Sequence, residues 1–351
     1  MTPQVAEGVA VAWMVVLGLV FGSFLNVVIA RVPTGESIVR PRSRCPKCGH
    51  TLAWFDNVPV LSWLVLRGRC RSCGQPISWR YPLIELLTGV LFFACQRRFG
   101  WTPELVAALV LVLVLVPLSF IDLEHWILPH ELTWPGIAAG VVLSAPLGLT
   151  RLRDSIIGAV TGFLVFWAME WVGEKIFKKE ALGAGDKDLL ALIGAFLTWK
   201  PLLGVIFLSS LQGAVVGLVM LLLHGRAGPA PGPESTPTPL APPLAQTPSS
   251  PPEQSPEQSP EQSEGAPAPL PVAGSSPGEA TMMEPARADQ TPRAEDGGGE
   301  GEDEEDDWVP GPTNIPFGPW LSIAALEVML LGPWLSAILP LPVNVLVTGG
   351  H

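Results

Sequence analysis

Apolar residues gather in runs along the chain, and short polar stretches separate most of the runs. A helix crosses a bilayer core with about 20 apolar residues, and most of the runs approach that length. They lie near residues 9–30, 82–98, 103–121, 134–149, 155–173, 189–199, 202–223 and 317–339. The sixth run is short and Gly332-Pro333 interrupts the eighth. The pattern predicts an all-α polytopic membrane protein with about eight transmembrane helices.

The first run is interpreted as a transmembrane helix rather than a cleaved signal peptide. A signal peptide has basic residues before its apolar region and a small-residue cleavage site after it. Here Glu7 and no Lys or Arg stands before the run, and Arg31 rather than a small-residue cleavage site follows it. Gly18 and Gly22, four residues apart within the run, favour the close approach of a second helix.

Basic residues are unevenly distributed among the loops. Nine Lys or Arg fall in residues 31–81 and four in residues 174–187, whereas the opposing loops together hold five. The positive-inside rule places the first two segments in the cytoplasm and the N-terminus outside. With eight spans, Asp122 and Asp186 then fall at the same cytoplasmic edge.

Residues 32–81 form a polar segment that holds four of the five cysteines, in two Cys-x-x-Cys pairs: Cys45, Cys48, Cys70 and Cys73. Four thiolates at this spacing are typical of a structural, tetrahedral Zn²⁺ site. Two disulfides are the alternative, which a reducing cytoplasm disfavours. His50 could replace one sulfur ligand, and Cys95 is expected to be an inert buried thiol. Because the segment has few apolar residues for a core, metal binding would supply much of its folding free energy.

Two aspartates stand at the edges of apolar runs, where an ionisable side chain is costly and indicates a functional site. Asp122 follows the third run, and Asp186 follows Gly183 and Gly185. These glycines permit unusual backbone dihedral angles and close approach of a substrate backbone. Two neighbouring carboxyl groups can share one proton, so that one acts as base and the other as acid. Alternatively, both aspartates are helix caps at the membrane interface. Three further acids lie in or near the runs, and each could assist, be a satisfied buried group or sit close to an interface: Glu85, Glu170 and Glu327.

Residues 226–312 differ in composition from the rest of the chain. They are rich in Pro, Ala, Ser and Glu, and their acidic residues outnumber the basic ones by 14. Because the whole chain carries −11, the remainder is mildly basic at +3. Such a segment cannot bury enough apolar surface to fold, so a disordered insert is expected, either a docking tail for basic partners or a tolerated flexible insert. The predicted organisation is a first transmembrane helix (1–31), a zinc-binding domain (32–81), a six-helix catalytic domain (82–225), the insert (226–312) and a last helix with its tail (313–351).

Several motifs stand in a fixed order along the chain. They are Gly22-Ser23-Phe24-Leu25-Asn26, the four-cysteine segment, Tyr81-Pro82-Leu83-Ile84-Glu85, Asp122 with Leu128-Pro129, Gly183-Ala184-Gly185-Asp186, and Ile315-Pro316-Phe317-Gly318-Pro319. Together they resemble the type IV prepilin peptidase family of Gly-x-Gly-Asp membrane aspartic proteases. The resemblance covers nearly everything except residues 226–312.

The resemblance implies a bifunctional enzyme of the bacterial inner membrane. One activity removes the basic leader from prepilins and pseudopilins on the cytoplasmic side, and the other methylates the new N-terminal amine with S-adenosylmethionine. By motif match, Asp122 and Asp186 are catalytic and the four cysteines belong to the metal-binding domain. The expected partners are these substrates, membrane lipid, and components of pilus or type II secretion assembly, but no nucleic acid.

Two positions depart from the family pattern. The family often has lysine two residues after the second aspartate, where this chain has Asp188, with Lys187 one position earlier. It commonly has Asp or Asn after Leu-Pro, where this chain has His130. Two other functions stay open: a non-catalytic zinc-ribbon scaffold for pilus or secretion assembly, and an intramembrane aspartic protease for another substrate.

Overall fold

The computed structural model describes residues 2–45, 47–177, 183, 185–224, 316–338 and 344. The chain divides into two units, the first made of Met1–Ala230 with Pro310–His351 and the second of Pro231–Val309. The second unit lies outside the described residues, as does the whole predicted insert 226–312. Every element named below belongs to the first unit.

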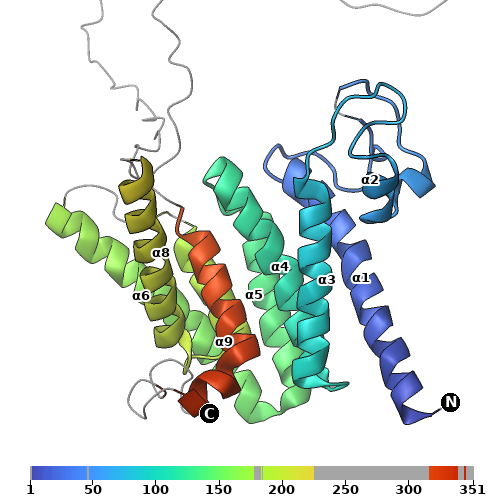
Figure 1. Ribbon diagram of the computed structural model, residues 1–351. Coiled ribbons are helices and arrows are strands. Elements are labelled where there is room, and N and C mark those ends of the chain that lie inside the picture. Colours follow the sequence, from blue (N-terminus) through green and yellow to red (C-terminus); the bar gives the residue numbers. More distant parts are fainter. Residues whose placement is uncertain are drawn as a thin grey trace, which may run out of the picture. The chain divides into compact units, whose positions relative to one another are not determined.

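Long helices make up the described part of the first unit (Figure 1). They are α1 (Pro3–Arg31), α3 (Arg80–Phe99), α4 (Pro103–His125), α5 (His130–Ser144), α6 (Leu149–Phe177), α7 (Asp186–Leu197), α8 (Leu202–His224) and α9 (Gly318–Ile338). Each overlaps one of the apolar runs in the sequence. Five of the described helices, α1, α4, α6, α8 and α9, are long and apolar enough to cross a membrane. Of the others, α3 carries three arginines and a glutamate, and α5 and α7 have only 15 and 12 residues.

Residues 32–79, between α1 and α3, form a small lobe that we call the cysteine lobe. It contains the 3₁₀ turn η1 (Trp54–Asn57) and the short helix α2 (Leu61–Val65). Successive long helices alternate in direction, so the end at which α1 stops and α3 starts is also where α4 stops and α5 starts (Figure 1). We call this the lobe end of the helices.

Two glycines let α1 pack closely against α3. A Cβ atom on Gly18 would lie 2.8 Å from the Cα of Gly89, and one on Gly22 would lie 2.7 Å from the Cα of Glu85. Any larger side chain would push the two backbones apart. The close helix approach predicted from the Gly18 and Gly22 spacing is therefore confirmed.

The short helix α7 is buried among its neighbours, and α6 supports it along its length. A Cβ atom on Gly162 of α6 would lie 2.5 Å from the carbonyl oxygen of Leu190. Near the other end of α7, the Ser155 hydroxyl donates to the carbonyl of Ala195 at 2.6 Å, and Arg151 donates to the carbonyl of Phe196 at 2.9 Å. These two side chains satisfy backbone acceptors that have no partner within the helix.

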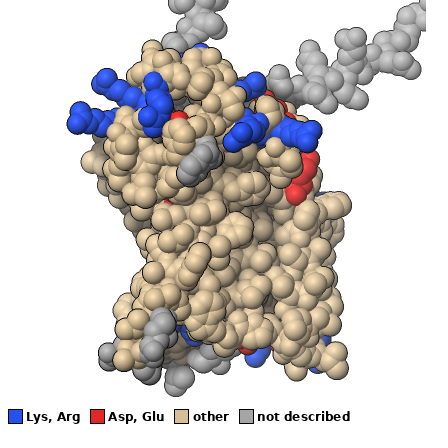
Figure 2. Space-filling model, turned by 90° about the vertical axis from the view of Figure 1, so that its right-hand side faces the viewer, with Lys and Arg blue, Asp and Glu red and all other residues tan. Residues whose placement is uncertain are grey.

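The outer surface of the helices is strongly apolar. Large hydrophobic side chains are exposed on several helices, among them Val20 on α1, Val106 on α4 and Leu218 on α8. Figure 2 shows a broad belt of uncharged residues below the Lys and Arg that gather at the lobe end. An apolar surface of this extent is costly in water and suits a lipid environment. The described residues therefore form an all-helical, multi-pass membrane protein.

Candidate active site and metal centre

Two matching backbone turns present the four cysteines. In the first, the N–H of Cys45 donates to the carbonyl of His50 and the N–H of Gly49 donates to the carbonyl of Cys45, both at 2.9 Å. The second turn repeats both bonds from Cys70 and Gly74, at 2.8 and 2.9 Å. The two glycines have φ values of 70° and 69°, a left-handed conformation that glycine adopts without strain. Both Cys-x-x-Cys-Gly motifs therefore fold in the same way.

The four sulfurs meet in one cluster. Their Sγ atoms all lie within 4.8 Å of one another, and those of Cys45 and Cys73 are 3.9 Å apart. Tetrahedral Zn–S bonds of about 2.3 Å place ligand sulfurs about 3.8 Å apart, so the spacing fits zinc. The thiols are free rather than disulfide-bonded. The N–H groups of Cys48 and Lys47 stabilise the thiolate and lower the pKa of Cys45 to about 7, which favours metal binding.

His50, which was considered as a replacement ligand, and Cys95, which was expected to be an inert buried thiol, both lie outside the metal cluster. Among the described residues the cluster consists of the four sulfurs alone, without the His50 side chain. Cys95 is buried within α3. The sequence prediction of a four-sulfur site is therefore matched by the geometry.

A buried carboxylate ties the cysteine lobe to the helices. The N–H of Val60 donates to Oε2 of Glu85 on α3 at 2.7 Å. Val60 has a φ of 61°, which is strained for a β-branched residue. The Glu85 contact helps to hold this strained turn against α3.

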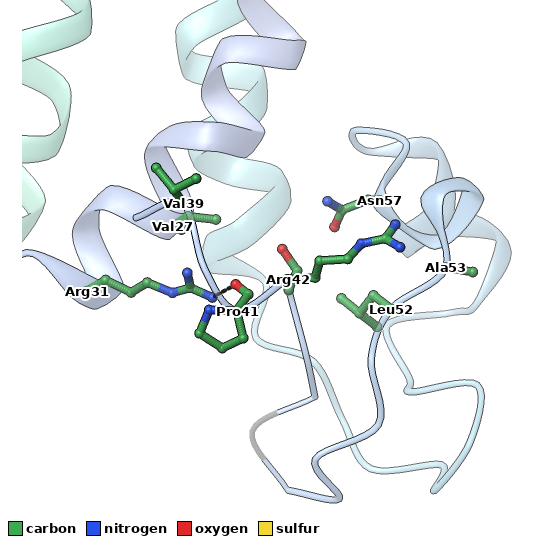
Figure 3. A pocket seen from close by; sticks show the side chains of 9 residues that line it. Val27, Arg31, Val39, Pro41, Arg42, Leu52, Ala53 and Asn57 are labelled. Atoms are coloured by element: carbon green, nitrogen blue, oxygen red, sulfur yellow. Dashed lines mark hydrogen bonds between the residues drawn. The ribbon is translucent and has the colours of Figure 1, made fainter. Parts of the chain in front are cut away.

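A cleft of about 200 Å³ lies between the end of α1 and the lobe. Figure 3 shows its walls, in which Arg31 reaches back to the carbonyl of Pro41 at 2.9 Å while Arg42 extends toward Asn57. In this view the two guanidinium groups lie apart from each other. They do not converge on a single ligand position.

Asp122 and Asp186 lie on neighbouring helices at the lobe end. Asp122 stands in the last turn of α4, and Asp186 is the first residue of α7. Each residue is only 6% exposed, and their carboxyl groups are close enough to interact electrostatically. Within the described part of the chain, Oδ2 of Asp122 is buried without a hydrogen-bond partner. Tertiary packing therefore brings the two predicted carboxylates together in a buried position.

The two glycines before α7 have different roles. The carbonyl of Gly183 accepts a hydrogen bond from the N–H of Asp186 at 3.1 Å. Gly185 lies against the α4–α5 connection, where a Cβ atom would be 2.6 Å from the Cβ of Leu128. Its φ of −84° is open to any residue, so the expectation of an unusual dihedral angle at Gly185 was wrong. Close packing against Leu128 is what requires a glycine there. Ala184 lies outside the described residues.

Gly318, the first residue of α9, also belongs to this site. Its backbone N–H interacts with the Asp122 carboxyl group, and a Cβ atom on it would lie 2.5 Å from Oδ2 of Asp122. Leu189 of α7 lies beside the same position. In the sequence, Gly318 belongs to one of the family motifs, but no role was predicted for it. The feature of the sequence that could have indicated a role for Gly318 is its place at the start of the last apolar run.

The three other membrane glutamates have partners of their own. Glu85 accepts the Val60 N–H, Glu170 pairs with Lys187 at 2.8 Å, and Glu327 is hydrogen-bonded to Gln212. Of the alternatives considered for them, the satisfied buried group is the one that these contacts favour.

Two family models match different regions of this chain. The bacterial peptidase A24 N-terminal domain matches residues 16–99, and the type IV leader peptidase family matches residues 109–218. A prepilin leader peptidase/N-methyltransferase from Myxococcus xanthus (strain DK1622) is 55% identical over 341 residues, which cover 96% of this chain and 95% of that protein. The chain belongs to the type IV leader peptidase family.

Other members of the family are more distant. Prepilin leader peptidase/N-methyltransferases from Aeromonas hydrophila and Neisseria gonorrhoeae are 41% and 39% identical, over 61% and 62% of this chain and 82% and 84% of their own lengths. No solved structure gives a significant match. The resemblance found in the sequence is thereby confirmed.

In this type IV leader peptidase, the two matched regions separate the two sites. The cysteine cluster lies within residues 16–99, and both aspartates lie within residues 109–218. Gly318 follows both matched regions, yet it contacts Asp122. The aspartate site therefore extends to α9.

Proposed function

We propose that Asp122 and Asp186 form the catalytic dyad with which this leader peptidase cuts its substrates. Family membership makes the chain an enzyme that removes leader peptides from prepilins and methylates the new N-terminus. What the dyad assignment adds is the identity of the groups that break the peptide bond. The observation that carries it is the burial of both carboxyl groups, from α4 and α7, within electrostatic reach of each other at one end of the helices.

The chemistry follows from placing two carboxyl groups together away from water. Both cannot be ionised at low cost, so the pair shares one proton. The ionised group activates a water molecule, and the protonated group polarises the scissile carbonyl and then gives its proton to the leaving amine. Oδ2 of Asp122 is buried without a close hydrogen bond among the described residues, and only the Gly318 N–H interacts with this carboxyl group, so the carboxyl group can bind that water or the substrate.

The substrate requirements fit the lobe end. A prepilin has an apolar helix that can lie in the bilayer against the spans, with its basic leader in the cytoplasm. We place the lobe end at the cytoplasmic face because residues 31–81 carry nine Lys or Arg. This orientation requires eight spans, with α3, α5 and α7 joining the five long apolar helices, and it keeps the predicted boundaries of the zinc-binding and catalytic domains at 32–81 and 82–225.

The cysteine lobe is proposed to hold a structural Zn²⁺ on Cys45, Cys48, Cys70 and Cys73. Bound zinc would fix the two Cys-x-x-Cys turns relative to each other, and with four sulfur ligands it would keep no position for a reacting water. S-adenosylmethionine would supply the methyl group. We assign no residue to the methyl donor.

The dyad is tested by replacing one carboxylate at a time. Asp122→Asn and Asp186→Asn, purified in lipid, should each lower prepilin cleavage by roughly 10²- to 10⁴-fold, because each removes an acid–base group without changing side-chain shape. Mass spectrometry of the product N-terminus gives cleavage and methylation from the same sample.

Asp154→Asn serves as the matched control. Asp154 lies in α6 near Arg151, whose side chain donates to the carbonyl of Phe196. Phe196 is at the opposite end of α7 from Asp186, so Asp154 is remote from the dyad. It should cleave at the wild-type rate. Near-normal cleavage by both Asp122→Asn and Asp186→Asn would overturn the dyad.

A further inference from the structure

The first turn of α7 directs three consecutive side chains toward three different neighbours. Successive residues of an α-helix point about 100° apart around its axis. Asp186 faces the Asp122 site, Lys187 reaches α6, and Asp188 reaches α5. The rotation of α7 about its own axis, and with it the direction of Asp186, is therefore set by what Lys187 and Asp188 contact.

On one side, Lys187 forms an ion pair with α6. Its Nζ lies 2.8 Å from Oε2 of Glu170, and both side chains are largely buried. Below this pair, α6 packs on α7 through glycines, so the two helices are in backbone contact.

On the other side, two side chains of α5 bind Asp188. Nδ1 of His130 lies 3.1 Å from Oδ2 of Asp188, and Nε1 of Trp134 lies 3.5 Å from the same oxygen. His130 and Trp134 stand four residues apart on α5, so they lie on the same face of the helix, and their rings are 5.6 Å apart. The α5 face thus presents a prearranged pair of donors to one carboxylate.

The burial of Asp188 makes its contacts with α5 important for the orientation of α7. The Asp188 side chain is only 9% exposed, and a buried carboxylate is costly unless it is paired and hydrogen-bonded. Rotating α7 away from α5 would leave that charge without its donors. It would also separate Gly185 from Leu128, which are in close contact just before α7 and α5 begin.

We propose that His130 and Asp188 are a positioning pair that fixes the rotation of α7, so that Asp186 faces Asp122. The proposal rests on the catalytic dyad proposed above, and it adds the residues that keep Asp186 oriented toward Asp122. Neither His130 nor Asp188 need touch the substrate. Their effect on the reaction passes through the direction of Asp186.

The two departures from the family pattern lie at the two positions of this pair. His130 stands where the family commonly has Asp or Asn, and Asp188 stands where it often has lysine. In this protein the two positions contact each other, through Nδ1 of His130 and Oδ2 of Asp188.

The experiment measures kcat and KM for prepilin cleavage, together with the melting temperature, for four variants of the pair and one control variant. His130→Ala and Asp188→Lys should each lower kcat roughly 10- to 100-fold, because a displacement of about 1 Å is enough for such a loss. KM should stay within about threefold, because binding of the substrate helix does not depend on Asp186. Asp188→Asn, which keeps the shape and loses the charge, should show a smaller loss of kcat.

The decisive variant is the exchange His130→Asp/Asp188→Lys. It restores an ion pair of reversed polarity, so it should recover at least about tenfold of the kcat lost in Asp188→Lys. Glu131→Gln, at an exposed position beside His130, is the control and should behave as wild type. A double variant no better than Asp188→Lys, or a melting temperature that falls while kcat per folded enzyme stays normal, would overturn the positioning role.

The outcomes separate this inference from the dyad itself. If Asp122→Asn and Asp186→Asn are inactive while His130→Ala has normal kcat, only the positioning pair fails. If those two aspartate variants still cleave, the dyad fails, whatever the His130 variants show.

Discussion

At the scale of single residues, the most constrained contact of the aspartate site is between Gly318 and Asp122. The carboxylate lies so close to the start of α9 that a Cβ atom on Gly318 would be 2.5 Å from its Oδ2. A carbon atom and a carboxylate oxygen cannot approach each other that closely, so the side chain of Asp122 or the start of α9 would have to move. A glycine is required here by the space that the carboxylate takes.

Gly318→Ala should therefore lower prepilin cleavage by roughly 100-fold, because the added methyl group displaces a catalytic carboxylate by an ångström or more. The loss is measured as the steady-state rate at which the purified enzyme cleaves prepilin. Gly332→Ala is the matched control on the same helix, where a Cβ atom would meet nothing within 4 Å. Equal activity of the two variants would contradict the role given to Gly318.

At the scale of helices, α7 is held by its packing rather than by its own length. It has 12 residues, which is marginal for an isolated helix. Its backbone touches α6 where Gly162 faces Leu190, and its far carbonyls accept bonds from Ser155 and Arg151. The α6–α7 contact therefore fixes the position of Asp186 along the α7 axis, and it also stabilises the packing of the helices.

Gly162→Ala should lower the melting temperature of the purified enzyme, because overpacking of backbone against backbone costs about 1–3 kcal/mol. Gly213→Ala on α8 is the control, since its Cβ atom would meet Trp320 at an ordinary 3.5 Å. There the gain in helix propensity of about 1 kcal/mol should leave stability unchanged or higher. Equal melting temperatures would show that α6 and α7 can separate without cost.

At the scale of the whole first unit, two polar contacts connect the cysteine lobe, through α3, to α4, which carries Asp122. Glu85 of α3 binds the Val60 turn, and Arg80 at the start of α3 pairs with Glu124, two residues after Asp122. The cysteine cluster itself belongs to the lobe and shares no residue with the aspartate site. The two sites are therefore connected through α3 but chemically separate.

Removal of the metal should accordingly affect the two activities unequally. Cys70→Ser should lose bound zinc, measured by atomic absorption, and should lose methylation to a greater extent than cleavage, because the lobe depends on the metal for its fold. Cys95→Ser, which changes a buried thiol of α3 outside the cluster, should keep one zinc per chain. Equal loss of both activities in a correctly folded Cys70→Ser enzyme would contradict the separation.

The sequence alone determined which segments are apolar helices, which four cysteines form a cluster, and which two aspartates stand at the edges of apolar runs. Each of these follows from local information. Hydropathy is a property of a segment, and Cys-x-x-Cys-Gly fixes a turn within five residues, as the matching bonds of Cys45 and Cys70 show. The composition of residues 226–312 was equally plain, although that segment lies outside the described residues.

Only the tertiary structure decided how these elements face one another. The contact between Gly318 and Asp122 joins α9 to α4, and the pairing of His130 with Asp188 depends on the rotation of α5 and α7 about their axes. In the sequence, His130 and Asp188 were two unrelated departures from a family pattern, and Gly185 was assigned to backbone freedom instead of to packing against Leu128. Such pairings are fixed by the packing of helices distant in the sequence, which no single segment encodes.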